Sequence, residues 1–155
     1  LLFVTFFNIG KIKFAPGTFA SLFACFLFLL LADLLNVIIL FFIVLLIFFY
    51  SFIAINNSFE SFSFEDSQEI VIDEVVGQML PLLAIPIYET LYPTSKTYYY
   101  VAAFFLFRLF DIWKPYPISY VDKNMEGAIG IMLDDVLAGI YVIIVLTFSF
   151  FFLGA

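Results

Sequence analysis

The chain has 155 residues, of which 65% are hydrophobic and 12% are charged, and its net charge is −7. Soluble domains contain about half apolar and about a quarter charged residues, and a water-soluble protein of this size has too little interior to bury so much apolar surface. The composition therefore predicts one integral-membrane domain over residues 1–155, and the acidic charge argues against a nucleic-acid partner, which requires a basic surface.

Two residue types narrow the possible chemistry. The sequence has no histidine, which excludes mechanisms with a histidine nucleophile, base or metal ligand. It has one cysteine, Cys25, so it offers neither a disulfide framework nor a thiolate metal site. Cys25 also lies in an apolar run, a setting that disfavours a reactive thiolate.

Five apolar stretches have the roughly 17–25 residues that a helix needs to cross a membrane. Pro16 and Gly17 open the first, and Pro115 ends the fourth because proline cannot donate the helical hydrogen bond. The segments 56–69 and 114–127 are predicted to be polar loops. The predicted spans are residues 14–32, 37–55, 70–88, 97–113 and 129–153. The predicted fold class is therefore all-α, a polytopic transmembrane helical bundle of about five spans.

The basic residues set the orientation of this bundle, because cytoplasmic loops of membrane proteins carry an excess of Lys and Arg. With a cytoplasmic N-terminus, five of the 6 basic residues lie at the inner face and Lys96 lies outside. The same topology places eleven of the 13 acidic residues at the inner face, all except Asp33 and Glu89. We therefore expect a cytoplasmic N-terminus and an acidic inner face.

Five carboxylates fall near the inner ends of the third, fourth and fifth predicted spans: Asp73, Glu74, Asp111, Asp134 and Asp135. A single acid near a helix end could simply reach out to water, although an acid within a span costs about 3 kcal/mol. Five clustered carboxylates repel one another unless they are protonated or neutralised. Oxygen ligands without His or Cys suit Mg²⁺ or Mn²⁺. The pattern predicts a divalent-metal site at the inner face.

Basic residues and helix ends beside these acids suit an anion. Arg108 and Asp111 are three residues apart and share a helix face, which Lys114 is expected to continue. Gly127 and Gly130 would let backbone N–H groups at the start of the fifth span approach a ligand, and helix N-termini bind phosphate. Together with the acids, these groups predict a phosphate–metal site. Arg108 and Asp111 could instead form a purely structural ion pair.

Four sequence blocks carry a resemblance to a known family: Ala-Pro-Gly-Thr at 15–18 followed by Ser21; Asp66 leading into Ile-Val-Ile-Asp-Glu-Val-Val-Gly at 70–77; Phe-Arg-Leu-Phe-Asp-Ile-Trp-Lys-Pro-Tyr-Pro at 107–117; and Asp-Lys-Asn at 122–124 followed by Gly127 and by Gly-Ile-Met-Leu-Asp-Asp-Val-Leu-Ala-Gly at 130–139. At these residues the chain resembles the phosphatidylglycerophosphatase A family of bacteria. It departs from the family pattern at Ala20 and Ala128, where glycine is usual, and at Ser61, where aspartate is frequent.

The resemblance implies Mg²⁺-dependent removal of the terminal phosphate from phosphatidylglycerophosphate, a membrane phospholipid, at the cytoplasmic face of the bacterial inner membrane. The expected metal ligands are Asp66, Glu74, Asp134 and Asp135, with Asp73 as an alternative to Asp66. The expected catalytic residues are Asp73, Arg108, Asp111, Lys114 and Asp135. The expected phosphate contacts are Arg108, Lys114, Thr18 and Asn124. Asp111 would either orient Arg108 or act as general base, and the sequence gives no oligomeric state.

Rival functions leave different signatures. A divalent-cation transporter would place acids at mid-depth on broken helices, whereas these acids lie near one face, and Arg108 and Lys114 would repel the cargo. A metal-dependent phosphatidyltransferase would carry a longer run of spaced aspartates with an Ala-Arg pair, which the sequence lacks. A non-enzymatic assembly subunit would leave the acid cluster unexplained.

Overall fold

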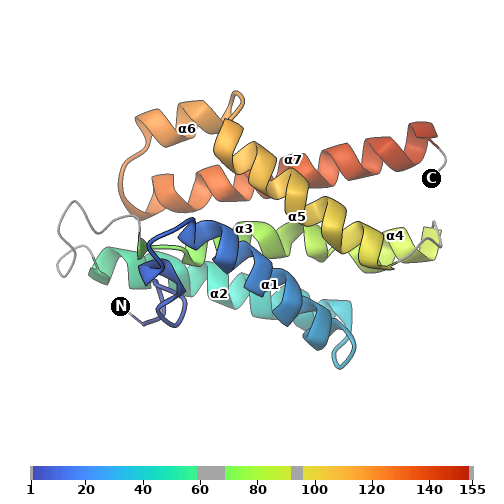
Figure 1. Cartoon of the computed structure of the whole chain (residues 1–155), viewed down its shortest axis with the longest axis horizontal. Helices are drawn as coiled ribbons and strands as arrows, with labels where there is room; N and C mark the ends of the chain where they lie inside the picture. Colours follow the sequence, from blue (N-terminus) through green and yellow to red (C-terminus); the bar gives the residue numbers. More distant parts are fainter. Residues whose placement is uncertain (1, 59–68, 92–95, 154–155) are drawn as a thin grey trace.

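The computed structural model describes residues 2–58, 69–91 and 96–153 (Figure 1). Within these ranges every regular element is a helix, which confirms the predicted all-α class. The helices are η1 (Ile9–Lys11), α1 (Pro16–Ala32), α2 (Val37–Ser58), α3 (Ile72–Leu82), α4 (Ile85–Leu91), α5 (Lys96–Trp113), α6 (Ile118–Asn124) and α7 (Gly127–Leu153).

Two helices of the described part are long and apolar enough to cross a membrane. They are α2, with 22 residues, and the Gly127–Ser149 part of α7, with 23 residues, and they match the predicted second and fifth spans. The first predicted span is also a helix, α1, but with 17 residues it is shorter. The fourth is α5, whose 18 residues include Arg108 and Asp111.

The third predicted span is not one continuous helix, and this prediction was wrong. Helix α3 ends at Leu82, and α4 begins at Ile85. Pro86 has no N–H to donate and its ring would clash with the carbonyl four residues earlier, which interrupts the helical hydrogen bonding at this point. The backbone N–H of Ala84 instead donates to the carbonyl of Pro81 at 3.1 Å. The predicted loop 114–127 was also wrong in part, because it contains α6.

Helix α3 lies in the middle of the bundle and packs most extensively against α7 and α1 (Figure 1). Eight of its 11 residues are buried. Glycines allow the close approach to α7: a Cβ on Gly77 would lie 2.7 Å from the backbone oxygen of Asp135, and one on Gly139 would lie 2.5 Å from the Gly77 carbonyl oxygen. The acids of α3 and α7 are brought together by this contact.

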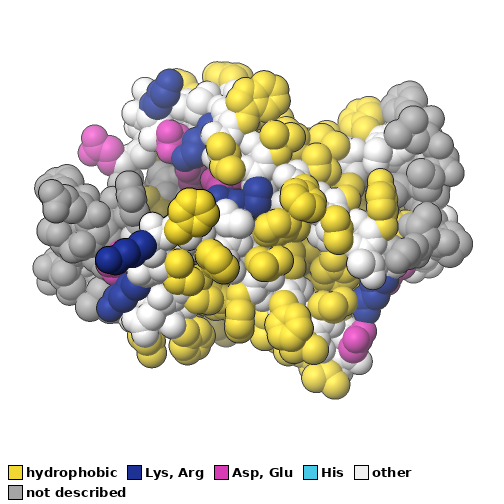
Figure 2. Space-filling view, viewed as in Figure 1, with side chains coloured by type: hydrophobic (Ala, Val, Ile, Leu, Met, Phe, Trp, Pro, Cys, Tyr) yellow, Lys and Arg dark blue, Asp and Glu magenta, His cyan; other side chains and the backbone are white. Residues whose placement is uncertain are grey.

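Helices α1 and α5 run antiparallel, as contacts along their length show. The Arg108 guanidinium donates to the Ser21 hydroxyl at 3.4 Å. Farther along, the rings of Phe28 and Tyr100 have centroids 6.5 Å apart. At the opposite end, Lys96 pairs with Asp33 at 2.6 Å. Hydrophobic side chains cover much of the surface between the charged groups of the two ends (Figure 2).

Candidate active site

Acids from three helices gather at one end of the bundle. Asp73 and Glu74 lie in the first turn of α3, Asp111 lies near the end of α5, and Asp134 and Asp135 lie near the start of α7. Asp135 is buried and interacts electrostatically with the four others. The structure therefore brings together the five carboxylates that the sequence placed at a common depth.

One arm of the site is centred on Arg108. Its guanidinium pairs with Asp111 at 2.7 Å, as the three-residue spacing predicted, and with Glu74 at 3.4 Å. Glu74 in turn rests on the first turn of α1, where a Cβ on Gly17 would overlap its carboxylate. The absence of a side chain at Gly17 therefore lets Glu74 approach the positive N-terminal end of α1. Thr18 lies beside Gly17 in the same turn.

A second arm is centred on Lys114, and here the structure differs from the prediction. Helix α5 ends at Trp113, and Lys114 has a positive φ of 46° that turns the chain away from the helix. Its ammonium pairs with Asp122 at 2.5 Å and Asp134 at 2.7 Å, not with Asp111. Burial alone would lower the pKa of Lys114, but these two hydrogen bonds outweigh burial and raise the pKa above its usual 10.5.

A polar cavity of about 530 Å³ opens between α3, α6 and α7. Its charged lining consists of Asp73, Lys114, Asp122 and Asp134. Gly127 and Gly130, in the first turn of α7, also line it. Gly127 has a positive φ of 73°, a conformation that glycine adopts without steric cost. An acidic wall, one ammonium and a helix N-terminus therefore face the same space.

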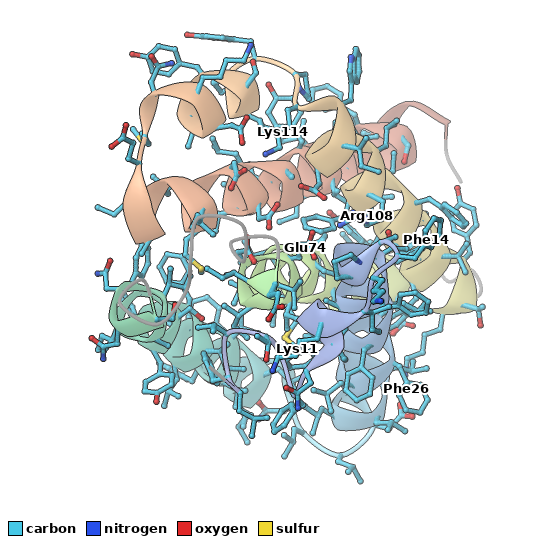
Figure 3. All side chains as sticks on the ribbon, turned by 60° about the vertical axis from the view of Figure 1, so that its left-hand side comes forward. Lys11, Phe14, Phe26, Glu74, Arg108 and Lys114 are labelled. Atoms are coloured by element: carbon cyan, nitrogen blue, oxygen red, sulfur yellow. The ribbon has the colours of Figure 1, made fainter. Side chains whose placement is uncertain are left out.

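The labelled side chains in Figure 3 show how the two arms are related. Arg108 lies between Lys114, near the polar cavity, and Phe14, which precedes α1. Glu74 lies toward the centre of the bundle. The two cations hold different carboxylates: Arg108 binds those of α3 and α5, and Lys114 binds those of α6 and α7.

The acidic side chains of the site partly fit a divalent metal. Oxygen atoms of Asp73 and Glu74 are buried without a hydrogen-bond partner, so they have free lone pairs for a cation. In the described ranges, however, no three acidic or cysteine side chains already converge as a ligand set. The chemistry of the donors suits Mg²⁺, but a metal would require some carboxylates to change rotamer.

Three predicted residues make no contact with the charged groups of the two arms or fall outside the described part. Asn124 is exposed, and its amide donates to the Tyr120 carbonyl at 2.7 Å, within its own helix. Thr18 lies at the start of α1 and, like Glu74, Arg108, Asp111 and Asp135, does not line the polar cavity. Asp66 falls outside the described residues.

Sequence reasoning missed three residues that the structure places at the site. Asp122 binds Lys114, and Ser21 binds Arg108. Gln78 is fully buried, and neither polar atom of its side chain has a hydrogen-bond partner in the structure. It lies four residues after Glu74, so both project from the same side of α3. The i, i+4 spacing was visible in the sequence, but the burial of Gln78 was not.

Comparison with known proteins adds independent evidence. The sequence model of the family described as phosphatidylglycerophosphatase A matches residues 2–150. A phosphatidylglycerophosphatase A of Haemophilus influenzae is 39% identical over 139 residues, covering 90% of this chain and 81% of the relative. One of Escherichia coli is 40% identical over 75 residues, 48% of this chain and 40% of the relative.

A protein of Bacteroides thetaiotaomicron, provisionally named a phosphatidylinositol-3-phosphatase, is 37% identical over 157 residues, covering 99% of this chain and 95% of the relative. No solved structure matches the chain. The match of the family model over nearly the whole chain includes all the acidic and basic residues of the site described above. The chain therefore belongs to the phosphatidylglycerophosphatase A family, whose members are phosphatases.

Proposed function

We propose that this protein hydrolyses the phosphate monoester of phosphatidylglycerophosphate, releasing phosphatidylglycerol and inorganic phosphate. The observation that carries the proposal is the polar cavity, where Lys114 and the N-terminus of α7 face the acids Asp73 and Asp134. Cations and helix ends bind phosphate, and family membership supplies the lipid class of the substrate.

We further propose that the chain is a five-pass protein of the bacterial inner membrane with its N-terminus in the cytoplasm. In Figure 1 the chain alternates in direction through α1, α2, the α3–α4 pair, α5 and α7. The N-terminal segment and α6 lie toward one end, and α7 finishes toward the other. This alternation supports the expected topology, and the excess of basic residues near the N-terminal end supports a cytoplasmic active site.

Mg²⁺ is the cofactor that we propose for this site. Glu74, Asp134 and Asp135 would hold it, together with Asp66. When bound, the ion would neutralise the acids and the phosphoryl oxygens and polarise the phosphorus centre. The unpartnered oxygen of Glu74 supports this assignment, because a buried anionic oxygen without a partner is otherwise unfavourable.

The side chains have distinct roles in the proposed reaction. Lys114 binds the phosphoryl oxygens at the N-terminus of α7, and Arg108 stabilises the negative charge that they carry in the transition state. Asp111 orients Arg108 through their 2.7 Å ion pair. Asp73, which lines the cavity, accepts a proton from the attacking water. The water oxygen forms the new bond to phosphorus, the bond from phosphorus to the glycerol oxygen breaks, and the glycerol oxygen takes up a proton.

Phosphate release by the purified protein in detergent tests this proposal. We expect release with Mg²⁺, none with EDTA, and a loss on the order of a hundredfold or more in Asp135→Asn. Asp33→Asn is the matched control, because Asp33 is exposed at the opposite end of the bundle and pairs with Lys96. Full activity in EDTA would show that the reaction needs no metal, and full activity in Asp135→Asn would show that Asp135 has no part in the mechanism. Binding of Mn²⁺, measured by electron paramagnetic resonance, provides a readout that does not depend on turnover.

Phosphatidylinositol 3-phosphate is an alternative substrate, because the Bacteroides thetaiotaomicron relative is named for a phosphatase that acts on it. Phosphatidylglycerophosphate and phosphatidylinositol 3-phosphate should therefore be compared at equal mole fraction in detergent. A higher kcat/KM for the inositol lipid would replace the proposed substrate and leave the phosphatase chemistry in place. Mg²⁺ flux in proteoliposomes without hydrolysis of either lipid would favour a transporter instead.

A further inference from the structure

A second, apolar hollow of about 700 Å³ lies on the α1–α5 side of the bundle. Three elements enclose it: η1 with the residue that follows it, α1 from Phe19 to Leu29, and α5 from Tyr100 to Phe105. The volume lies within the roughly 300–1,000 Å³ of pockets that hold ligands. Apart from the hydroxyl of Tyr100 and the thiol of Cys25, its lining side chains are hydrocarbon. We refer to this hollow as the α1–α5 groove.

The length of the groove matches one leaflet of a bilayer. Its α1 wall extends from Phe19 to Leu29, which are ten helical steps apart. At about 1.5 Å per residue this wall is about 15 Å long, and the hydrocarbon core of a bilayer is about 30 Å thick. The groove is therefore as long as an acyl chain that extends from the headgroup region to the bilayer midplane.

One end of the groove meets the candidate active site. Phe104 and Phe105 line the α5 wall, and Arg108 follows within one helical turn. On α1, Ser21, which accepts the hydrogen bond from Arg108, lies between Phe19 and Leu22 of the other wall. At the far end, the antiparallel helices are joined by the Lys96–Asp33 ion pair. The guanidinium of Arg108 is therefore at the end of the groove from which a phosphate-bearing lipid would enter.

We propose that the α1–α5 groove binds one acyl chain of the substrate lipid and thereby positions its phosphate at the active site. This inference rests on the proposed phosphatase function, and it adds a chain-binding site to it. The chemistry favours this occupant: a phospholipid is anionic at one end and apolar along its tail, and the groove is apolar along its walls and ends beside Arg108, which reaches Ser21 of α1. A helix from a second copy of the chain would match the walls but would bring no anion to Arg108.

Filling the groove tests the proposal. Val101 lines it and is 48% exposed, so Val101→Trp adds bulk to the groove without overpacking the core. Ile144→Trp is the matched control, because Ile144 is 46% exposed on α7 and lines none of the cavities described. The substrates are phosphatidylglycerophosphates with two 16-carbon chains or two 6-carbon chains, the shorter of which can reach the phosphate site without filling the groove.

We expect Val101→Trp to lower kcat/KM for the long-chain lipid about tenfold. The displaced acyl chain can enter the detergent, which is as apolar as the groove, so the variant loses only the positioning of the phosphate. The short-chain lipid should be hydrolysed at the wild-type rate, and Ile144→Trp should change neither. An equal loss of kcat/KM on both lipids, or no loss on either, would overturn the proposal that the groove binds an acyl chain. A wild-type protein that hydrolyses neither lipid would instead overturn the proposed function.

A cross-linking measurement keeps the groove testable without turnover. The probe is a phosphate-terminated lipid with a diazirine midway along one acyl chain, and adducts are located by mass spectrometry. The groove predicts adducts on α1 and α5 that disappear in Val101→Trp and persist in Ile144→Trp. Adducts spread evenly over the exposed faces of α2 and α7 as well, or unchanged by Val101→Trp, would show ordinary lipid contact and contradict the proposal.

Discussion

The contact between α3 and α7 makes a prediction whose sign can be derived from the structure. Gly77→Ala places a Cβ 2.7 Å from the Asp135 carbonyl oxygen and 2.9 Å from the Phe107 ring. Ordinary contact begins at 3.4 Å, so the helices must separate by about 0.7 Å, the difference between 3.4 and 2.7 Å. Overpacking of this kind typically costs about 1–3 kcal/mol, against a gain of up to about 1 kcal/mol because alanine favours a helix.

The net expectation is a loss of roughly 1–2 kcal/mol of stability and a lower midpoint of thermal unfolding in detergent. Activity should fall on the order of tenfold, because the shift separates Asp73 and Glu74 from the acids of α7 and catalytic geometry tolerates less than 1 Å of displacement. Gly139→Ala clashes with Gly77 from the other helix at 2.5 Å and should share the loss of stability. A higher unfolding midpoint in Gly77→Ala would refute the close contact itself.

Three further predictions concern Lys114 and the segment that carries it. Lys114→Met should lower kcat/KM by at least about a hundredfold, with Lys123→Met, exposed on α6, as an unaffected control. The raised pKa keeps the Lys114 ammonium charged, so its ion pairs stabilise the folded state below pH 10.5, and this stabilisation is lost only above that pH. Lys114→Arg should therefore leave the alkaline limb of the activity profile unchanged up to about pH 10. A wild-type decline at lower pH that is absent from Lys114→Arg would contradict this. Tyr141→Phe removes a 2.8 Å hydrogen bond to the Tyr116 carbonyl and should cost about 1 kcal/mol of stability, measured by thermal unfolding; an unchanged midpoint would show that this bond does not hold the loop.

Helices with long apolar runs were predictable because composition and length alone determine them. Helix α2 begins at the predicted Val37 and extends three residues beyond the predicted end at Ile55, into Asn and Ser. The break between α3 and α4 was missed because hydropathy does not register the lost N–H of Pro86. Helix α6 was missed because its 7 residues are too few to be stable alone; its packing against α7 supports it.

The site was predictable where it depends on spacing within one helix and unpredictable where it depends on a contact between helices. The Arg108–Asp111 pair follows from their separation of three residues and is present at 2.7 Å. Lys114 could not be placed in this way, because the chain leaves the helix at Trp113 and turns through a positive φ. The contact between Gly17 and Glu74 required knowledge of how α1 crosses α3, which no local pattern encodes.

The shortness of α3 has a consequence for how such a chain enters a membrane. Its 11 residues span about 16 Å, roughly half of the hydrocarbon, and the break after Leu82 leaves backbone groups that lipid cannot satisfy. Its first turn also carries two acids. Neighbouring helices cover these groups in the folded protein, but α5 and α7 are synthesised later. On the proposed topology, segment 70–91 should therefore fail to insert when expressed alone and insert when the later helices are present, which glycosylation mapping of truncated chains would measure. Helix α3 would therefore insert fully into the membrane only after α7 has been synthesised.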